Sequence, residues 1–260
     1  MNRTLVGIGA GLLVTLANLQ PLVAADITNL PDEPPIYRIE VHYLKPGAGA
    51  SYEAAVKGLI AALKGANINL PTWDFSVASG DRDVYMTIDP SERWADLDRF
   101  DLDGEAAMKS LGPRLELFYH DAHAALLRES DLFIETEPAK SDPGAIGENG
   151  LNLLHADLFH AASARAVATD LRAIQKIYRD AHSPVSCRLY RAVTGDDLPM
   201  IILLRSAPDH TRYLEDARLS ESNRTNVEAL LADARRNSRK TETMDLTVRP
   251  DLSYHVKLSP

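Results

Sequence analysis

The chain has 260 residues, of which 45% are hydrophobic, 25% charged and 6% aromatic. This is the composition of a folded globular protein, and it excludes a wholly disordered or fibrous chain. The formal net charge is -9, from 28 basic and 37 acidic residues. A general attraction to nucleic acid or to an anionic membrane surface is therefore not expected.

The first 25 residues have the pattern of a secretory signal peptide. Arg3 supplies positive charge, the stretch from Leu5 to Leu16 is apolar, and small residues precede Asp26. The apolar stretch is short for a membrane span, which needs about 20 residues. We expect an exported chain, periplasmic or secreted, that begins near Asp26 and keeps no stable membrane anchor after cleavage. An uncleaved anchor is the alternative.

Cysteine usage limits the chemistry, because Cys187 is the only cysteine of the chain. No intrachain disulfide can form, and thiolate sites for zinc or iron–sulfur clusters are excluded. Cys187 alternates with Val185 and Leu189 on a predicted strand, so we interpret it as a buried small side chain rather than a nucleophile.

Residues 26–139 predict a first α+β unit. Its first strand alternates, with Tyr37, Ile39 and Val41 on one side, and Ser51 is the expected N-cap of the helix that follows. In chain order the predicted elements are a strand, a helix, two strands, a helix and a strand: 36–44, 51–66, 73–78, 84–88, 105–128 and 131–137.

Residues 140–150 are rich in small residues and predict a linker to a second unit over 151–260. The second unit repeats the same order: 151–159, 163–180, 185–192, 200–205, 223–240 and 244–249. The segment 132–138 resembles 244–250, 112 positions later in the chain, and both segments fall on the last predicted strand of their unit. We infer an internal duplication.

The predicted fold class is α+β: two tandem ferredoxin-like βαββαβ units packed sheet to sheet as a pseudo-twofold α/β barrel. The reason is physical, because the helices of such a unit cover only one face of its sheet and leave the other to be buried. The chain would then be a monomer with an internal pseudo-dimer. The alternative is a homodimer in which each half pairs with another chain.

Two short segments carry a family resemblance. The segment 41–47, followed by 52–57, resembles the strand-to-helix entry of the dimeric α/β-barrel superfamily related to antibiotic-biosynthesis monooxygenases. The segment 249–254 resembles the tail of uncharacterised exported members. The resemblance implies the fold and no single reaction, since the superfamily includes oxygenases, isomerases, haem enzymes and proteins of unknown activity.

Strand alternation gives the candidate catalytic residues. If Ile39 and Val41 face the helices, Glu40 and His42 face the barrel interior, because successive strand side chains point to opposite sides. The same argument sends His155 and Asp157 inward and matches His42 to His155, 113 positions later. We predict proton transfer by the two histidines, with Glu40 and Asp157 as orienting carboxylates.

The same alternation predicts a ligand-binding set of Arg38, Tyr85, Arg188 and Tyr190. Four further side chains are expected to point inward: Asp74, Glu135, Arg205 and Asp245. The alternative is a structural polar interface in which these charges pair with one another.

These residues indicate an exported barrel that binds a small organic molecule, with cofactor-independent oxygenation or proton transfer as the candidate reaction. The alternative is a non-catalytic binding or interaction protein. A third candidate is haem binding through His120 or His123, because some haem-binding relatives place an axial histidine on this helix. No metal or resident cofactor is otherwise expected. The sequence has no Gly-rich phosphate loop, Gly-x-Ser-x-Gly elbow or His-Glu-x-x-His helix.

Overall fold

A computed structural model describes residues 36–68, 73–77, 84–91, 105–106, 109–136, 153–195, 197–207, 211, 213 and 219–254. They belong to one folded unit, Pro34–Pro260. The predicted signal peptide and the predicted linker lie outside the described residues. Of the helices that the structure describes, none is long and apolar enough to cross a membrane.

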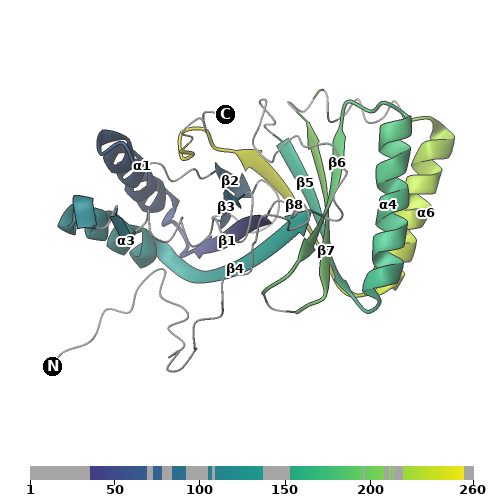
Figure 1. Cartoon of the computed structure of the whole chain (residues 1–260), viewed down its shortest axis with the longest axis horizontal. Helices are drawn as coiled ribbons and strands as arrows, with labels where there is room; N and C mark the ends of the chain where they lie inside the picture. Colours follow the sequence, from purple (N-terminus) through teal and green to yellow (C-terminus); the bar gives the residue numbers. More distant parts are fainter. Residues whose placement is uncertain are drawn as a thin grey trace, which may run out of the picture. The chain divides into compact units, whose positions relative to one another are not determined.

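The elements follow the predicted order in both halves (Figure 1). The helices are α1 (Gly49–Gly65), α3 (Pro113–Ala125), α4 (Ala164–Asp180) and α6 (Glu221–Arg236). The strands of the first half are β1 (Ile36–Leu44), β2 (Trp73–Val77), β3 (Val84–Ser91) and β4 (Leu126–Thr136). Those of the second half are β5 (Leu153–Ala161), β6 (Ser186–Ala192), β7 (Met200–Ala207) and β8 (Ser238–Val248).

The strands form a closed antiparallel barrel in the order β1-β3-β2-β8-β5-β7-β6-β4. Each half contributes one sheet in the ferredoxin-like order, β4-β1-β3-β2 and β8-β5-β7-β6. The edges of the two sheets are joined by the pairs β2–β8 and β4–β6. The predicted fold class is confirmed, and one chain supplies both halves of the barrel.

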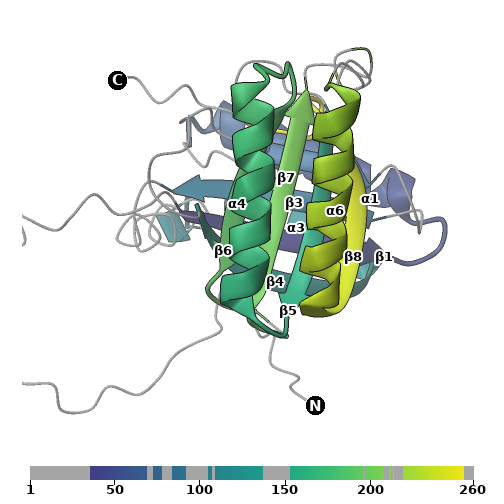
Figure 2. The same ribbon diagram turned by 90° about the vertical axis from the view of Figure 1, so that its right-hand side faces the viewer.

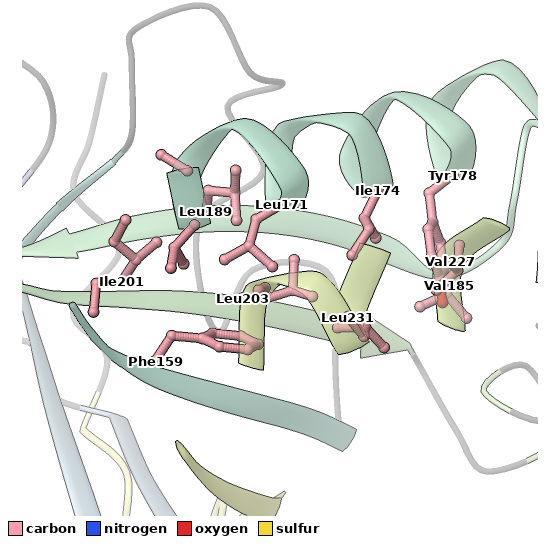
Figure 3. Packing of buried hydrophobic residues seen from close by; sticks show 14 of the residues in the cluster. Phe159, Leu171, Ile174, Tyr178, Val185, Leu189, Ile201, Leu203, Val227 and Leu231 are labelled. Atoms are coloured by element: carbon pink, nitrogen blue, oxygen red, sulfur yellow. The ribbon is translucent and has the colours of Figure 1, made fainter. Parts of the chain in front are cut away.

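The helices cover the outside of this barrel. In Figure 2, α4 and α6 lie side by side across the sheet of the second half. Figure 3 shows how their apolar side chains, such as Leu171 and Leu231, meet the outward side chains Phe159 and Leu203 of the strands. This layer is the largest apolar cluster that the structure describes on the outer face, and Leu171 and Leu203 are fully buried in it.

The barrel interior is a separate apolar core built from strands alone. It includes Ile39 and Val41 of β1, Met86 of β3, Ile134 of β4 and Leu204 of β7, and it continues around the barrel through strands of both halves. The apolar phase of β1 therefore faces inward, and the polar phase faces the helices. This reverses the predicted orientation of both first strands.

Several predicted helix boundaries also change. Helix α1 has Ala48 as its N-cap residue and no side-chain cap, while Ser51 Oγ donates to the carbonyl of Ala48. Helices α3 and α6 end at Ala125 and Arg236, earlier than predicted, because the chain passes into β4 and β8 almost at once. Apolar residues at the start of β4 continue the helical pattern, so the sequence has no turn signal at that point.

Candidate functional site

The structure separates the predicted site residues into three environments. Arg38, Glu40 and His42 lie on the outer face of β1, where the Nδ1 atom of His42 is 2.6 Å from the hydroxyl of Tyr52 on α1. His155 and Asp157 lie on the outer face of β5, the face that carries Phe159 of the core beneath α4 and α6. A third environment, the barrel interior, contains Arg188 and Tyr190. The predicted common pocket for His42 and His155 is therefore wrong.

The internal repeat also aligns differently from the prediction. The last strands, β4 and β8, are 112 positions apart, as expected. The pairing register of each first strand with the last strand of its half shifts at one point. The shift lies at Tyr43/Leu44 in β1 and at His160/Ala161 in β5, and these points are 117 positions apart. Glu40 consequently corresponds to Asp157, and His42 corresponds to Phe159. The two histidines are not equivalent, and the offset of 113 is corrected to 117.

His42 is the centre of a group of titratable side chains on the outer face of the first half. Its Nε2 atom is 3.6 Å from Glu40 Oε2 and 3.6 Å from Glu129 Oε1, and the imidazole is 13% exposed. Burial alone would lower the pKa of His42, but the carboxylates of Glu129 and Glu40 outweigh it and raise the pKa to about 9. With no metal ion bound, the imidazole is thus cationic at neutral pH.

Two further side chains orient this group. Arg38 Nη2 is 2.6 Å from Glu40 Oε1, whereas the other carboxylate oxygen, Oε2, is the one 3.6 Å from His42. The ring of Tyr52, whose hydroxyl contacts His42, packs against Tyr85 with 4.9 Å between ring centroids. Arg38 is therefore a partner of Glu40, in place of the predicted ligand-binding role in the barrel interior.

Tyr85 also lies on the outer face, which corrects its predicted place in the interior. Its hydroxyl donates to Glu53 Oε1 at 2.7 Å, and the guanidinium of Arg249 binds both oxygens of Glu53, at 2.6 and 2.9 Å. The hydrogen bonds from Arg249 lower the pKa of Glu53 to about 2. Burial and the contact with Glu53 raise the pKa of Tyr85 to about 12. Tyr85 remains protonated and serves as a hydrogen-bond donor.

In the second half, His155 belongs to a network with paired charges. Its Nδ1 atom is 2.5 Å from Asp245 Oδ1, and its Nε2 atom is 3.5 Å from Asp157 Oδ2. Asp157 also accepts hydrogen bonds from Arg205 at 2.9 Å and from Thr243 at 3.0 Å. Asp245 and Arg205 are therefore on the outer face, as is Glu135, which pairs with Arg191. These charges pair with one another, as in the structural alternative, but they do so on the outer face and not at the interface of the two sheets. The predicted inward side chain of Asp74 lies outside what the structure describes.

Arg188 and Tyr190 occupy the interior face of β6, as predicted. Tyr190 is 1% exposed, belongs to the interior core, and meets Tyr37 edge to face with 5.7 Å between ring centroids. The hydroxyl of Tyr190 and the Nε atom of Arg188 are buried, and among the described residues neither has a hydrogen bond of good geometry, although the Arg188 side chain is close enough to the Tyr190 hydroxyl to interact with it. Burial raises the pKa of Tyr190 well above its ordinary value, and the nearby Arg188 only partly opposes this.

Several polar side chains of these networks were not predicted from the sequence, among them Tyr52, Glu129 and Glu53, and neither was the separate pair of His160 and Glu242. Glu129 was not singled out because it directly follows the segment predicted as a helix, although β4 begins at Leu126. The imidazole of His160 is 2.9 Å from Glu242 on β8. Strand register alone could have paired Glu129 with His42, because these two residues lie opposite each other on β4 and β1.

The helix that carries His120 and His123 does not fit the predicted haem site. The side chain of His120 is 74% exposed and contacts the neighbouring Asp121, and His123 is exposed as well. A shallow groove of about 460 Å³ between α1 and α3 is lined mainly by alanines, with Phe118 and Asp121, and by neither histidine. These residues supply no buried axial ligand.

No protein-family model and no curated protein matches the sequence. Solved structures do match the fold. An anthrone oxidase-like protein has 9% identity and a TM-score of 0.55, over 84% of this chain and 92% of that protein. A candidate monooxygenase of Fusobacterium nucleatum has 13% identity and a TM-score of 0.52, over 83% and 93%. Chlorite dismutase from Candidatus Nitrospira defluvii, in complex with imidazole, has 10% identity and a TM-score of 0.50, over 85% and 93%.

These similarities show the fold. The chain has the ferredoxin-like dimeric α+β-barrel fold, with both halves of the barrel in one polypeptide. At such low identity the similarity shows the fold alone, and the residues of the site must carry any statement about function.

Proposed function

We propose that this chain is a small-molecule-binding α+β barrel whose ligand contacts Arg188 and Tyr190 in the barrel interior. The observation that carries the proposal is a pair of neighbouring buried groups on β6, the Tyr190 hydroxyl and the Arg188 Nε, for which the described residues supply no acceptor of good geometry. A buried polar group without a partner costs about 1–3 kcal/mol, so most such groups in folded proteins are satisfied. A ligand that supplies acceptors would remove this cost.

The chemistry of the surroundings defines the ligand class. Arg188 is a cation and Tyr190 is a neutral donor, so both favour an oxygen acceptor such as a carboxylate or a carbonyl. The interior core around them is apolar, with side chains such as Met86, Ile88 and Leu204. The ligand is therefore a small organic molecule with an apolar body and one acceptor group.

Oxygenation or proton transfer by His42 and His155 is not part of this proposal. The two imidazoles lie on the outer face of the sheet, opposite the side chains of Arg188 and Tyr190, and in different halves of the barrel. Both ring nitrogens of His155 already face carboxylates. A ligand in the interior would not reach either histidine, so the geometry favours the non-catalytic alternative.

The proposal includes export to the periplasm or the medium, with cleavage near Asp26 and domain limits at 26–139 and 151–260. The N-terminal pattern of positive charge, apolar stretch and small residues supports it. Intact-mass measurement of protein from its own host should give a chain that lacks Met1–Ala25. A retained Met1 in the purified protein would overturn the cleavage.

Native mass spectrometry of the full chain tests the binding proposal, first for a co-purified molecule and then with added benzoate as a probe. Arg188→Met and Tyr190→Phe should each weaken benzoate binding about tenfold or more, because each removes one donor. Met86→Leu is the matched interior control and should bind as the wild type does. Equal binding by all four proteins, or no co-purified molecule and no benzoate binding, would overturn the proposal.

A further inference from the structure

We infer that Glu40, His42 and Glu129 bind a divalent transition-metal ion on the outer face of the first half. The imidazole Nε2 atom and one oxygen of each carboxylate all lie within 4.8 Å of one another. They come from facing positions of β1 and β4, two hydrogen-bonded strands of the barrel wall. The three ligand atoms therefore converge on a rigid element rather than on a loop.

The distances fit a coordination sphere better than a hydrogen-bonded cluster. His42 Nε2 is 3.6 Å from each carboxylate oxygen, which is too long for a hydrogen bond. Two ligand atoms that are each about 2.0–2.2 Å from a shared metal ion stand roughly 3.3–3.8 Å apart at tetrahedral or wider angles. The His42 Nε2 atom is thus at the right distance to share an ion with either carboxylate. The two carboxylate oxygens lie within 4.8 Å of each other, so a small side-chain rotation is enough to bring all three atoms onto one ion.

Outer partners hold two of the three ligands in the required orientation. The Tyr52 hydroxyl is 2.6 Å from His42 Nδ1, so the ring can donate from Nδ1 and present the lone pair of Nε2 to an ion. Arg38 binds Glu40 through Oε1 and leaves Oε2 directed toward His42. Metal-ligating histidines and carboxylates commonly have such partners.

The charges and burial of the ligands also suit a divalent ion. A neutral His42 with ionised Glu40 and Glu129 carries two negative charges, which a divalent cation balances. The side chains are 13%, 15% and 26% exposed, so an ion can enter while the surroundings still shield it from bulk water.

The fold itself does not require these three residues, because the second half has the same strand order without them. At the corresponding positions of the second half stand Asp157, Phe159 and Thr241, by the offsets of 117 and 112 given above. Only the carboxylate of Asp157 is retained there, and Arg205 and Thr243 already bind it. The inferred site therefore belongs to the first half alone and is distinct from the proposed ligand site in the barrel interior.

The ligand types indicate the class of ion. Carboxylates suit Mg²⁺, Ca²⁺ and Mn²⁺, whereas imidazole suits zinc and iron, so one imidazole with two carboxylates selects Mn²⁺, Fe²⁺ or Zn²⁺. Affinity among these should follow the usual order, with Mn²⁺ weakest and Zn²⁺ tightest.

Titration calorimetry of the metal-stripped full chain with Zn²⁺, Mn²⁺ and Mg²⁺ tests the inference. We expect one tight Zn²⁺ per chain, weaker Mn²⁺ binding and no tight Mg²⁺ binding. His42→Gln and Glu129→Gln should lower the Zn²⁺ affinity at least 100-fold, and Tyr52→Phe should lower it about 10-fold. His155→Gln is the matched control, a histidine between two carboxylates in the other half, and should leave the affinity unchanged.

X-ray absorption spectroscopy of the zinc-loaded wild type tests the inference without any variant. A first shell with one imidazole and otherwise oxygen ligands is expected. No tight Zn²⁺ binding, undiminished binding by a folded His42→Gln variant, or a shell with two imidazoles or none would overturn the inference.

Discussion

The outer faces of the two halves differ, although both halves have the same strand order. Beneath α4 and α6 there is one continuous apolar core, which includes Phe159, Leu171 and Leu203 (Figure 3). Beneath α1 and α3 the described apolar residues divide into two small clusters, one around Leu115 and one around Tyr52. Polar side chains of β1 and β4 are grouped around His42 on this face. The comparison suggests that the second half supplies more of the stability, while the first half has room for a metal ion.

Truncation of a core leucine in each half should have the largest effect on stability and tests this comparison most directly. Leu171 on α4 is 0% exposed, so Leu171→Ala should lower the free energy of unfolding by about 3–4 kcal/mol. Leu63 on α1 is 5% exposed and lies in a smaller cluster, so Leu63→Ala should cost about 1 kcal/mol less. Urea denaturation of both variants measures the difference. A larger loss for Leu63→Ala would show that the first half is the more stable one.

The loss of stability on removing an arginine from a carboxylate should also be larger in the second half than in the first. Asp157 is 5% exposed, and burial opposes its ionisation, but His155 and Arg205 lower its pKa below the ordinary value. Arg205→Met removes a partner of this buried carboxylate and should cost about 3 kcal/mol. Glu40 is 15% exposed, so Arg38→Met should cost only about 1 kcal/mol.

Denaturation of the Arg205→Met and Arg38→Met variants at neutral pH provides the measurement. Asp157→Asn in the Arg205→Met background should restore part of the loss, because it removes the unpaired charge. Equal costs for the two arginines would contradict the difference in burial between their partners.

The protonation of His42 gives a smaller effect that depends on pH. Its pKa is about 9 in the folded chain and 6.5 as the ordinary value, because Glu129 and Glu40 outweigh the effect of burial. A raised pKa stabilises the fold below pH 6.5, and this contribution is lost as the pH rises to about 9. The full contribution is roughly 3 kcal/mol, or somewhat less where neighbouring groups titrate together.

The expected result is a loss of stability of metal-stripped wild type between pH 6.5 and 9 that His42→Gln does not show. Chemical denaturation in the presence of EDTA at several pH values measures it. The difference between the two proteins isolates His42 from His155, whose pKa is also raised, by Asp157 and Asp245 against the effect of burial. An identical pH dependence of wild type and variant would show that His42 is uncharged in the folded chain.

The element order was predictable because strands and helices differ in the spacing of apolar residues, and turn residues separate most of the elements. The 112-residue repeat of β4 and β8 was predictable from short local similarity. The helix-to-strand boundary at Ala125 and Leu126 was not, because apolar residues continue across it.

The orientation of β1 and β5 could not be obtained from alternation alone. Both faces of each strand are buried, one in the barrel and one beneath helices, so alternation shows two faces without showing which is the interior. The closed barrel keeps the apolar phase of β1, with Ile39 and Val41, inside. The partners of His42 were missed for a related reason, since Tyr52 and Glu129 approach it only through tertiary packing and strand register.

The smallest predicted effect concerns the interior that the two halves share. Tyr190→Phe removes a buried hydroxyl that has no acceptor of good geometry among the described residues and only a contact with Arg188, so the ligand-free chain should gain up to about 1 kcal/mol of stability. Tyr254→Phe is the matched variant on the outer face, because its hydroxyl donates to the carbonyl of Ile68 at 2.5 Å. That substitution should instead cost about 1 kcal/mol. Thermal denaturation of ligand-free protein should therefore move the two midpoints in opposite directions. A loss of stability in Tyr190→Phe would show that the hydroxyl already has a partner within the protein, and it would remove the main support for a ligand in the barrel interior.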